Sequence, residues 1–171
     1  MTRAESDTLK ASFAPVIDPR TRVLILGSLP GEVSLARAQY YAHPQNQFWR
    51  LMQAVTGAPL VDLAYPARLR SLLEAGAGLW DVVRIARRTG SLDADIRDHT
   101  PNPLRALAVG LPGLRAIAFN GAKASAIGRR QFGADLDCAL ITLPSSSPAH
   151  TLAFAAKAAA WVRLKAFLVE A

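Results

Sequence analysis

The stretch that decides the fold runs from Gly27 to Trp49 and reads GSLPGEVSLARAQYYAHPQNQFW. An apolar run, TRVLIL at residues 21–26, comes directly before it, and apolar residues at helical spacing follow it. Its glycines, prolines, paired tyrosines and side-chain amides suit neither a strand nor a helix. We therefore expect a shaped loop at the carboxyl end of a buried strand, where α/β sheets bind ligands. The alternative is an ordinary connection with incidental polar residues.

The rest of the chain alternates apolar runs with segments of helical spacing. Short apolar runs predict four strands, at residues 21–26, 78–83, 114–119 and 138–143. Apolar spacing and flanking prolines and glycines predict five helices, at residues 46–55, 66–75, 103–109, 122–131 and 150–169. This alternation favours a single three-layer α/β/α domain with a mainly parallel central sheet of about four strands.

Two segments fall outside this pattern. Residues 1–20 open with MTRAESDTLKAS, which carries charges of both signs and no apolar centre. We expect a flexible lead there rather than a secretory signal, with the domain over residues 21–171. Residues 84–102 are the most polar stretch and have no strong period, which indicates a long loop. Such a loop inside a compact domain is either functional or a solvated connection.

The composition favours a polyanionic partner. Lysine and arginine number 20 against 13 aspartates and glutamates, a formal net charge of +7. Each phosphate that a basic side chain neutralises releases counterions, so nucleic acid suits such a chain. No run approaches the roughly 18 apolar residues of a membrane span. Cys138 is the only cysteine, which excludes an intrachain disulfide and favours a reducing, cytoplasmic location.

Several familiar catalytic motifs are absent from the sequence. GSLPGE matches neither the dinucleotide-binding pattern G-x-G-x-x-G nor the P-loop. The three histidines have no metal-ligand spacing, and neither HExxH nor CxxC occurs, so we expect no metal. The three serines at 145–147 lie between prolines and do not form the G-x-S-x-G elbow of an α/β hydrolase.

Four motifs occur in a characteristic order. They are GSLPG at 27–31, YYAHPQNQFW at 40–49, FNG at 119–121 and LPSSSPAH at 143–150. In this order they resemble the uracil-DNA glycosylase superfamily, and most of all its hypoxanthine (deoxyinosine) DNA glycosylase branch. Mismatch-specific uracil/thymine glycosylases are nearer relatives than the cluster-bearing members. The resemblance covers residues 21–150 and implies a monomeric, nucleoid-associated enzyme of base excision repair that needs no cofactor.

The resemblance also implies a pocket that receives a base flipped out of DNA containing deaminated bases. Tyr41 is the candidate for stacking on that base, since the family has an aromatic residue there; the alternative is a core tyrosine. Tyr40 is expected to be structural. The residues expected to contact the base are Gly27, Ser28, Leu29, Pro30, Gly31, Tyr41, Phe48 and Asn120.

Catalysis requires a positioned polar group, and one departure from the family bears on it. Mismatch-specific relatives have asparagine as the third residue of the first motif, where this chain has Leu29, and leucine cannot orient water. Asn46 is the expected substitute because its amide both donates and accepts; the alternative is a helix N-cap. His43 is a candidate proton donor or a loop brace, and Glu32 is a weaker candidate for activating water.

The last motif resembles the loop that grips the DNA backbone. Serine hydroxyls and backbone N–H groups suit phosphate oxygens, which position a protein without reading sequence. The expected DNA contacts are Ser145, Ser146, Ser147, Pro148 and His150.

The expected activity is hydrolysis of the N-glycosidic bond of hypoxanthine first and uracil second. No lysine lies in a site motif, so no Schiff base and no strand cleavage are expected. Two alternatives stay open. One is a catalytically weak member of the same fold that binds DNA or a free nucleobase. The other is a small α/β hydrolase or transferase unrelated to nucleic acid.

Overall fold

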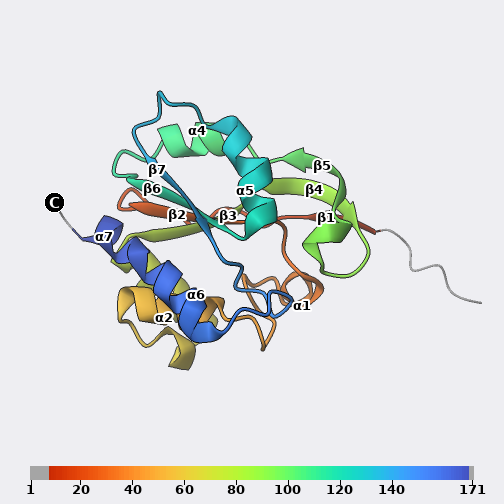
Figure 1. The fold of residues 1–171 in the computed structure, drawn as a ribbon, viewed down its shortest axis with the longest axis horizontal. Coiled ribbons are helices and arrows are strands. Elements are labelled where there is room, and N and C mark those ends of the chain that lie inside the picture. The colour runs from red at the N-terminus through yellow and green to blue at the C-terminus, as the bar shows by residue number, and fades with distance from the viewer. Residues whose placement is uncertain (1–7, 170–171) are drawn as a thin grey trace, which may run out of the picture.

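The fold is built on a four-stranded parallel sheet with strand order β3-β2-β6-β7 (Figure 1). A computed structural model describes residues 8–169. The strands are β2 (Val23–Gly27), β3 (Ala77–Asp81), β6 (Ala116–Asn120) and β7 (Ala139–Leu143). Every pairing among them is parallel, and every strand overlaps one of the four predicted runs. The predicted central sheet is therefore confirmed.

Helices cover both faces of this sheet. One face carries α2 (Phe48–Thr56), α3 (Tyr65–Ala75) and α6 (Phe154–Trp161), and the other carries α4 (Leu104–Val109) and α5 (Ala122–Gly128). Side chains alternate along β2, so Val23 and Ile25 pack with the first group and Leu24 and Leu26 with the second. All five residues of β2 are buried for this reason. This arrangement confirms the predicted three layers.

Short helices occupy several connections. The loop after β2 contains α1 (Glu32–Arg37), which the sequence pattern did not predict, and η1 (Leu60–Asp62) follows α2. The predicted helix at 122–131 ends as η3 (Arg129–Gln131). The predicted helix at 150–169 is wrong over its first four residues and is divided into α6, η4 (Val162–Leu164) and α7 (Lys165–Leu168).

A second, antiparallel sheet replaces the long loop predicted over residues 84–102. It consists of β1 (Thr8–Ala11), β4 (Val83–Arg88) and β5 (Arg97–Pro101), in the order β1-β4-β5, with η2 (Asp93–Asp95) between β4 and β5. The loop prediction is wrong. Both faces of β5 and one face of β4 are exposed, so these strands contain many polar residues and lack the apolar run by which a buried strand is recognised.

This sheet also shortens the predicted flexible lead. Residues 8–11 pair with β4, and Val16 exchanges backbone hydrogen bonds of 2.8 and 2.9 Å with Leu79. The prediction of a flexible lead is therefore wrong for residues 8–20, while residues 1–7 lie outside the described residues.

The carboxyl ends of the parallel strands meet at one edge. Gly27 at the end of β2 pairs with Asp81 at the end of β3, and Asn120 pairs with Leu143 in the same way. The loops that leave this edge carry the motifs singled out in the sequence. Across residues 8–169, no helix is both long enough and apolar enough to span a bilayer.

Candidate active site

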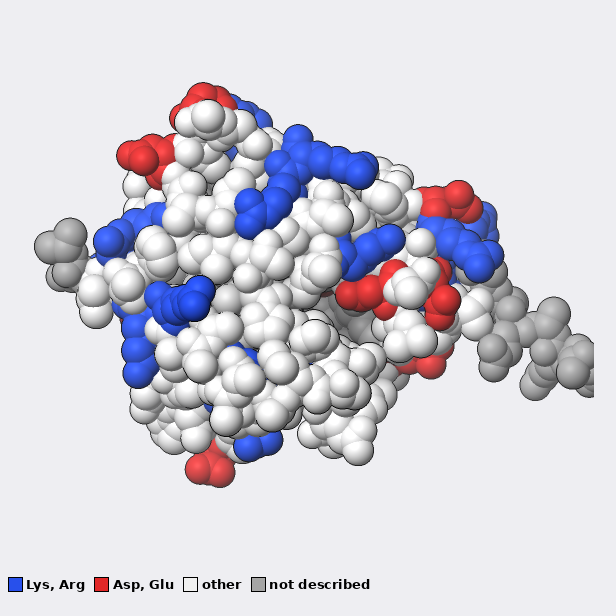
Figure 2. All heavy atoms as spheres, in the orientation of Figure 1, with Lys and Arg blue, Asp and Glu red and all other residues white. Residues whose placement is uncertain are grey.

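A cavity of about 650 Å³ lies at the carboxyl edge of the parallel sheet. Figure 2 shows the surface hollowed near α1, with acidic side chains at the rim of the hollow. The walls come mainly from residues 27–34, 40–46, 91–94 and 145–150. Every site residue predicted from the sequence lines this cavity except Phe48. The segments that carry these residues therefore meet at one cavity.

Gly27 forms the tightest part of the cavity floor. A Cβ atom at this position would lie 2.6 Å from Asp81 Oδ1 and 2.9 Å from the Tyr41 hydroxyl. A carboxyl group and a phenol thus crowd against the backbone at the end of β2. Any larger residue at position 27 would displace one of them, so glycine is required here by space.

Tyr41 and Phe48 form an aromatic stack behind the cavity wall. Their ring centroids are 3.9 Å apart and their planes differ by 17°. Phe48 is fully buried, which explains why it does not reach the cavity. Tyr41 has a left-handed backbone with φ of 54°, and burial raises the pKa of its phenol, so the ring is held neutral. One face of the Tyr41 ring is covered by Phe48, and the residue itself lines the cavity.

The neighbouring Tyr40 has a different role. It is 4% exposed, and its hydroxyl donates a hydrogen bond of 2.9 Å to the Ala14 carbonyl oxygen. The residue therefore ties the loop to the segment after β1, in agreement with the structural role expected for it.

Asn46 has one half of its amide engaged. Its Oδ1 accepts a hydrogen bond of 3.0 Å from the Phe48 backbone N–H at the start of α2. The N-cap of α2 is Gln47, which makes no side-chain cap bond, so the N-cap position considered for Asn46 is wrong. The Asn46 bond satisfies the first N–H of α2 and fixes which way the amide points. Because Oδ1 faces the helix, Nδ2 is the atom left to donate into the cavity that Asn46 lines.

His43 lies three residues earlier on the same loop and is exposed. Its Nδ1 accepts a hydrogen bond of 3.1 Å from the Gln45 backbone N–H, while Asn46 N donates to the His43 carbonyl oxygen. The imidazole thus braces the turn through one nitrogen. Its other nitrogen can still reach a ligand in the cavity, which His43 lines.

Asn120 joins three parts of the site. Its Nδ2 donates to Ser146 Oγ at 2.9 Å and to the Tyr41 hydroxyl at 3.3 Å, and its Oδ1 accepts from the Ser146 backbone N–H at 2.9 Å. Both ends of the amide are therefore engaged within the protein. The residue lines the cavity as predicted. Its bonds hold the Tyr41 ring and the loop that contains Ser146 in place.

Residues 144–150, called the serine loop here, are hydrogen-bonded to Gln47, just before α2, and to two side chains of α6. Ser146 is 1% exposed, and its carbonyl oxygen accepts from Gln47 N at 3.0 Å. Trp161 donates to the Pro144 carbonyl oxygen at 2.9 Å, and the buried Lys157 donates to the Ser147 carbonyl oxygen at 3.2 Å. The loop is therefore a fixed part of the cavity wall.

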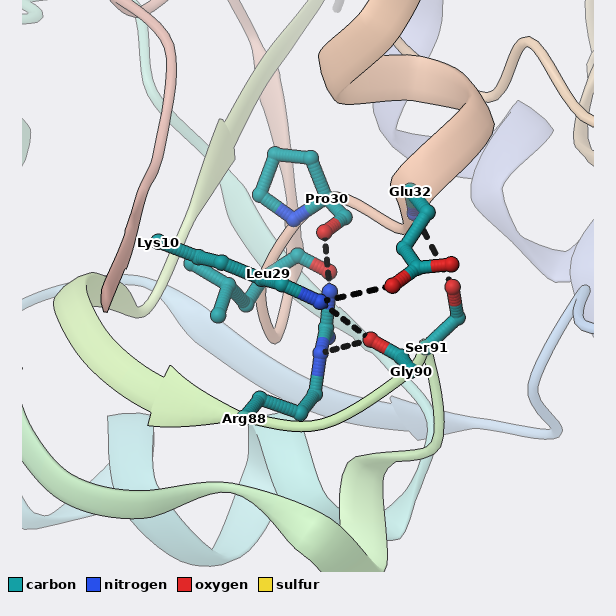
Figure 3. A network of polar contacts seen from close by, with 7 residues as sticks. All are labelled: Lys10, Leu29, Pro30, Glu32, Arg88, Gly90 and Ser91. Atoms are coloured by element: carbon teal, nitrogen blue, oxygen red, sulfur yellow. Dashed lines mark hydrogen bonds and ion pairs between the residues drawn. The ribbon is translucent and has the colours of Figure 1, made fainter. Parts of the chain in front are cut away.

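Arg88 supports the first motif from the other side (Figure 3). Its side chain is fully buried and donates to the carbonyl oxygens of Leu29, Pro30 and Gly90. A guanidinium group is suited to this because its five N–H donors form a rigid planar fork. The GSLPG backbone is thus locked to the turn after β4.

Glu32 takes part in the same network (Figure 3). Its carboxylate pairs with Lys10 at 3.3 Å, and its backbone N–H donates to Ser91 Oγ at 2.9 Å. The Glu32 side chain is 62% exposed, which marks the cavity rim. Its contacts hold α1 against the loop after β4.

Comparison with known proteins identifies the family. The model of the uracil DNA glycosylase superfamily matches residues 14–168. The chain belongs to this superfamily. A protein of Methanosarcina barkeri described as hypoxanthine DNA glycosylase is 45% identical over 114 residues, 67% of this chain and 72% of the relative. A Methanosarcina acetivorans protein of the same description is 44% identical over 116 residues, 68% of this chain and 73% of the relative.

A solved structure agrees with this assignment to the superfamily. The solution structure of a Methanosarcina acetivorans protein, described as a candidate uracil DNA glycosylase, superposes with a TM-score of 0.82 and is 37% identical. The match covers 94% of this chain and 99% of the other. The fold class, the superfamily and the DNA glycosylase role expected from the motifs are thereby confirmed.

Asp81 is one of the cavity residues of this glycosylase that sequence reasoning missed. It lines the cavity, is 4% exposed, and its Oδ2 is buried without a hydrogen-bond partner among the described residues. Burial raises the pKa of its carboxyl to about 7, and the nearby Asp93 carboxylate acts in the same direction against the opposing charge of Arg88. The available signal was a single acidic residue inside the apolar run GLWDVV.

Proposed function

We propose that this DNA glycosylase removes hypoxanthine first and uracil second from DNA, by hydrolysing the bond between base and sugar. The observation that carries the proposal is the convergence of all four family motifs on one cavity that also holds an aromatic ring. The relatives described as hypoxanthine DNA glycosylase, at 44–45% identity, support hypoxanthine as the preferred base.

Tyr41 is assigned to stack on the extruded base. A flipped base needs a flat apolar surface to replace its lost neighbours in the duplex. Phe48 and the bond from Asn120 hold the Tyr41 ring in place before a base arrives. Since Phe48 covers one ring face, the base uses the opposite one.

Asn46 is assigned to the chemical step. When the C1′–N bond breaks, its electron pair leaves with the base, water adds to C1′, and a water proton neutralises the base. An amide donor that is already oriented stabilises such charge without a reorganisation cost. Asn46 has this property because Phe48 N fixes its Oδ1.

The other residues considered for that step suit it less well. Leu29 is 6% exposed and packs in the core cluster of Leu24 and Leu26, so it only shapes the wall. The Glu32 carboxylate is paired with Lys10, which favours a bracing role. His43 is assigned to loop bracing through Nδ1, with its second nitrogen facing solvent or substrate.

The serine loop is assigned to the DNA backbone flanking the flipped nucleotide. Ser145, Ser147, Pro148 and His150 lie at the cavity mouth, while buried Ser146 holds the loop in shape. The net charge of +7 favours binding to phosphates. We propose that the enzyme acts as a monomer in the cytoplasm, associated with the nucleoid.

The test is a single-turnover assay on an oligonucleotide with one deoxyinosine, compared between wild type, Asn46→Ala and Asn46→Ser. Serine keeps an oxygen that can accept from the Phe48 N–H, whereas alanine does not. Both variants should excise hypoxanthine about 10²-fold more slowly than wild type. Only alanine should also cost about 1 kcal/mol of stability. A serine variant with wild-type excision would remove Asn46 from the chemical step, and DNA binding without base release would favour a binding protein.

A further inference from the structure

Lys157 carries a buried charge that the proposed roles leave unexplained. It is 1% exposed in α6, next to the serine loop, and its Nζ donates to the Ser147 carbonyl oxygen at 3.2 Å. Within residues 8–169, no acidic side chain forms an ion pair with it. Burial disfavours the charged form and lowers the pKa of the ammonium group. A bound anion would offset the cost of burying this charge.

We propose that the Lys157 ammonium is the buried counter-charge for one DNA phosphate, which the Ser145 and Ser147 hydroxyls bind on the outer side of the serine loop. The inference rests on the proposed contact between this loop and DNA, and it adds the residue that supplies the positive charge. Lys157 acts through the loop and through its electric field, without touching the phosphate. It is therefore a positioning residue.

The two serine hydroxyls are arranged to donate to such a ligand. Ser145 Oγ accepts from the Ser147 N–H at 3.1 Å, and Ser147 Oγ accepts from the Ala149 N–H at 3.2 Å. Neither hydroxyl donates its own proton to another group among the described residues. Both serines line the cavity and are half-buried. Two oriented donors are thus available to phosphate oxygens, which only accept.

The Ser147 backbone is prepared for a negative ligand as well. Its carbonyl oxygen accepts from Lys157 Nζ and also from the His150 N–H at 3.1 Å. A carbonyl oxygen left free at this point of the loop would repel a phosphate. Because two donors occupy it, the negative end of this peptide group is offset from within the protein.

The ammonium is close enough to act on a phosphate bound at the loop. It contacts the backbone of Ser147, whose side chain is one of the two proposed phosphate ligands. The separation is therefore comparable to the screening length of about 8 Å at physiological salt. Protein rather than water fills most of the space between the two charges, so their attraction is screened less than that of an exposed ion pair.

The charges elsewhere at the cavity make this position informative. Glu32 and Asp93 line the cavity, and Figure 2 shows acidic side chains at its rim. Carboxylates repel phosphates, so they disfavour a DNA backbone that passes over them. A positive charge behind the serine loop favours that wall instead.

The experiment measures how salt affects DNA binding by wild type, Lys157→Met and Lys165→Met. The DNA carries one 2′-fluoro-deoxyinosine, whose fluorine slows cleavage, and salt is raised from about 50 to about 200 mM. Methionine is close to lysine in shape and has no charge. In Lys157→Met, the slope of log Kd against log salt should fall by about 1, with affinity about tenfold weaker at the lowest salt. An unchanged slope would overturn the proposal.

Lys165→Met is the matched control because it removes the same charge at an exposed position. Lys165 lies in α7, which Figure 1 shows at the opposite end of the helical layer from α1. This variant should keep the wild-type slope. An equal fall in both variants would reduce the effect to net charge and overturn the role of Lys157.

Stability separates a counter-charge from a structural brace. Replacing a buried charge by an apolar side chain of similar volume is often neutral or stabilising. Lys157→Met should therefore unfold at the same urea concentration as wild type or at a higher one, although it binds DNA more weakly. A variant that does not fold, or that unfolds earlier and keeps the wild-type slope, would assign Lys157 to the fold alone and overturn the proposal.

Neutral methylphosphonates, placed one at a time in the same DNA, identify the phosphate. One position near the lesion should weaken binding by wild type about tenfold and binding by Lys157→Met hardly at all, because both changes remove the same interaction. Equal effects on both proteins at every position would refute the pairing.

These binding measurements require no chemical step, so they separate this proposal from the proposed function. A slope that depends on Lys157, in a protein that releases no hypoxanthine from deoxyinosine DNA, would leave the phosphate contact standing and refute the glycosylase function. Normal release of hypoxanthine together with an unchanged slope would refute only the role of Lys157.

Discussion

Replacing Asp81 by asparagine should make the stability of the protein less sensitive to pH. The folded-state pKa of this carboxyl is raised from 3.8 to about 7, a difference of about three units. Each unit corresponds to about 1.36 kcal/mol, so ionising Asp81 costs the folded state about 4 kcal/mol in all. The carboxyl is 4% exposed, so solvent does little to reduce that cost.

The sign follows from proton linkage. The folded state holds the proton more tightly than the unfolded state, so Asp81 favours folding at low pH, and this contribution is lost as pH rises from about 4 to 7. The asparagine side chain of the variant has no such proton to lose. The variant should therefore gain about 1.4 kcal/mol per pH unit relative to wild type across that window, with no further gain above it.

Urea unfolding of both proteins between pH 4 and pH 9 measures this difference directly. Other titrating groups are common to both proteins and cancel in the comparison. The exposed control Asp62→Asn should show a nearly constant offset from wild type. An Asp81→Asn offset that is also constant, or that favours wild type as pH rises, would show that Asp81 is ionised in the folded protein and refute the reasoning.

Three further predictions concern the remaining parts of the site. Tyr41→Ala should weaken binding of lesion DNA by about 1–3 kcal/mol in a fluorescence titration, whereas Tyr41→Phe should lose only the hydrogen bond from Asn120 and bind nearly as wild type; equal loss in both would assign the role to the hydroxyl. Raising salt from about 50 to about 200 mM should weaken DNA binding by about 10³-fold if about six phosphates are contacted, and a flat response would contradict phosphate contacts. Gly27→Ala should abolish excision, because the new Cβ overlaps the space of Asp81 Oδ1 and the Tyr41 hydroxyl; wild-type rates in this variant would show that the cavity floor is deformable.

Most of the central sheet could be predicted from sequence because β2, β3 and β6 are buried on both faces. TRVLIL and LRAIAF are nearly continuous apolar runs, and such runs are typical of a parallel strand that is covered on both faces. β4 and β5 could not be found this way. Arg88 is fully buried in β4 because backbone carbonyl oxygens satisfy its guanidinium group, and no periodicity indicates that. Residues 8–11 become a strand only because β4 is there to pair with.

The sequence predicted which residues line the candidate site, but it did not predict which hydrogen bonds they make. The motifs placed Tyr41, Asn46 and the serine loop around one cavity because strand ends converge by topology. Which atoms remain free depends on side-chain geometry. Asn120, expected to contact the base, uses its whole amide on Ser146 and Tyr41. Asp81 lies in the cavity beside Gly27 because the two residues pair across the sheet, and the register of that pairing cannot be read from the sequence.

Base release tests the central claim most directly. Wild-type protein is incubated in excess with an oligonucleotide that carries a single deoxyinosine, and the products are separated by chromatography before and after mild alkali. The account predicts free hypoxanthine in equal amount to abasic sites, with strands intact until alkali is added and uracil released more slowly from a matched substrate. Intact deoxyinosine bound to the protein, or strand cleavage without alkali, would contradict it.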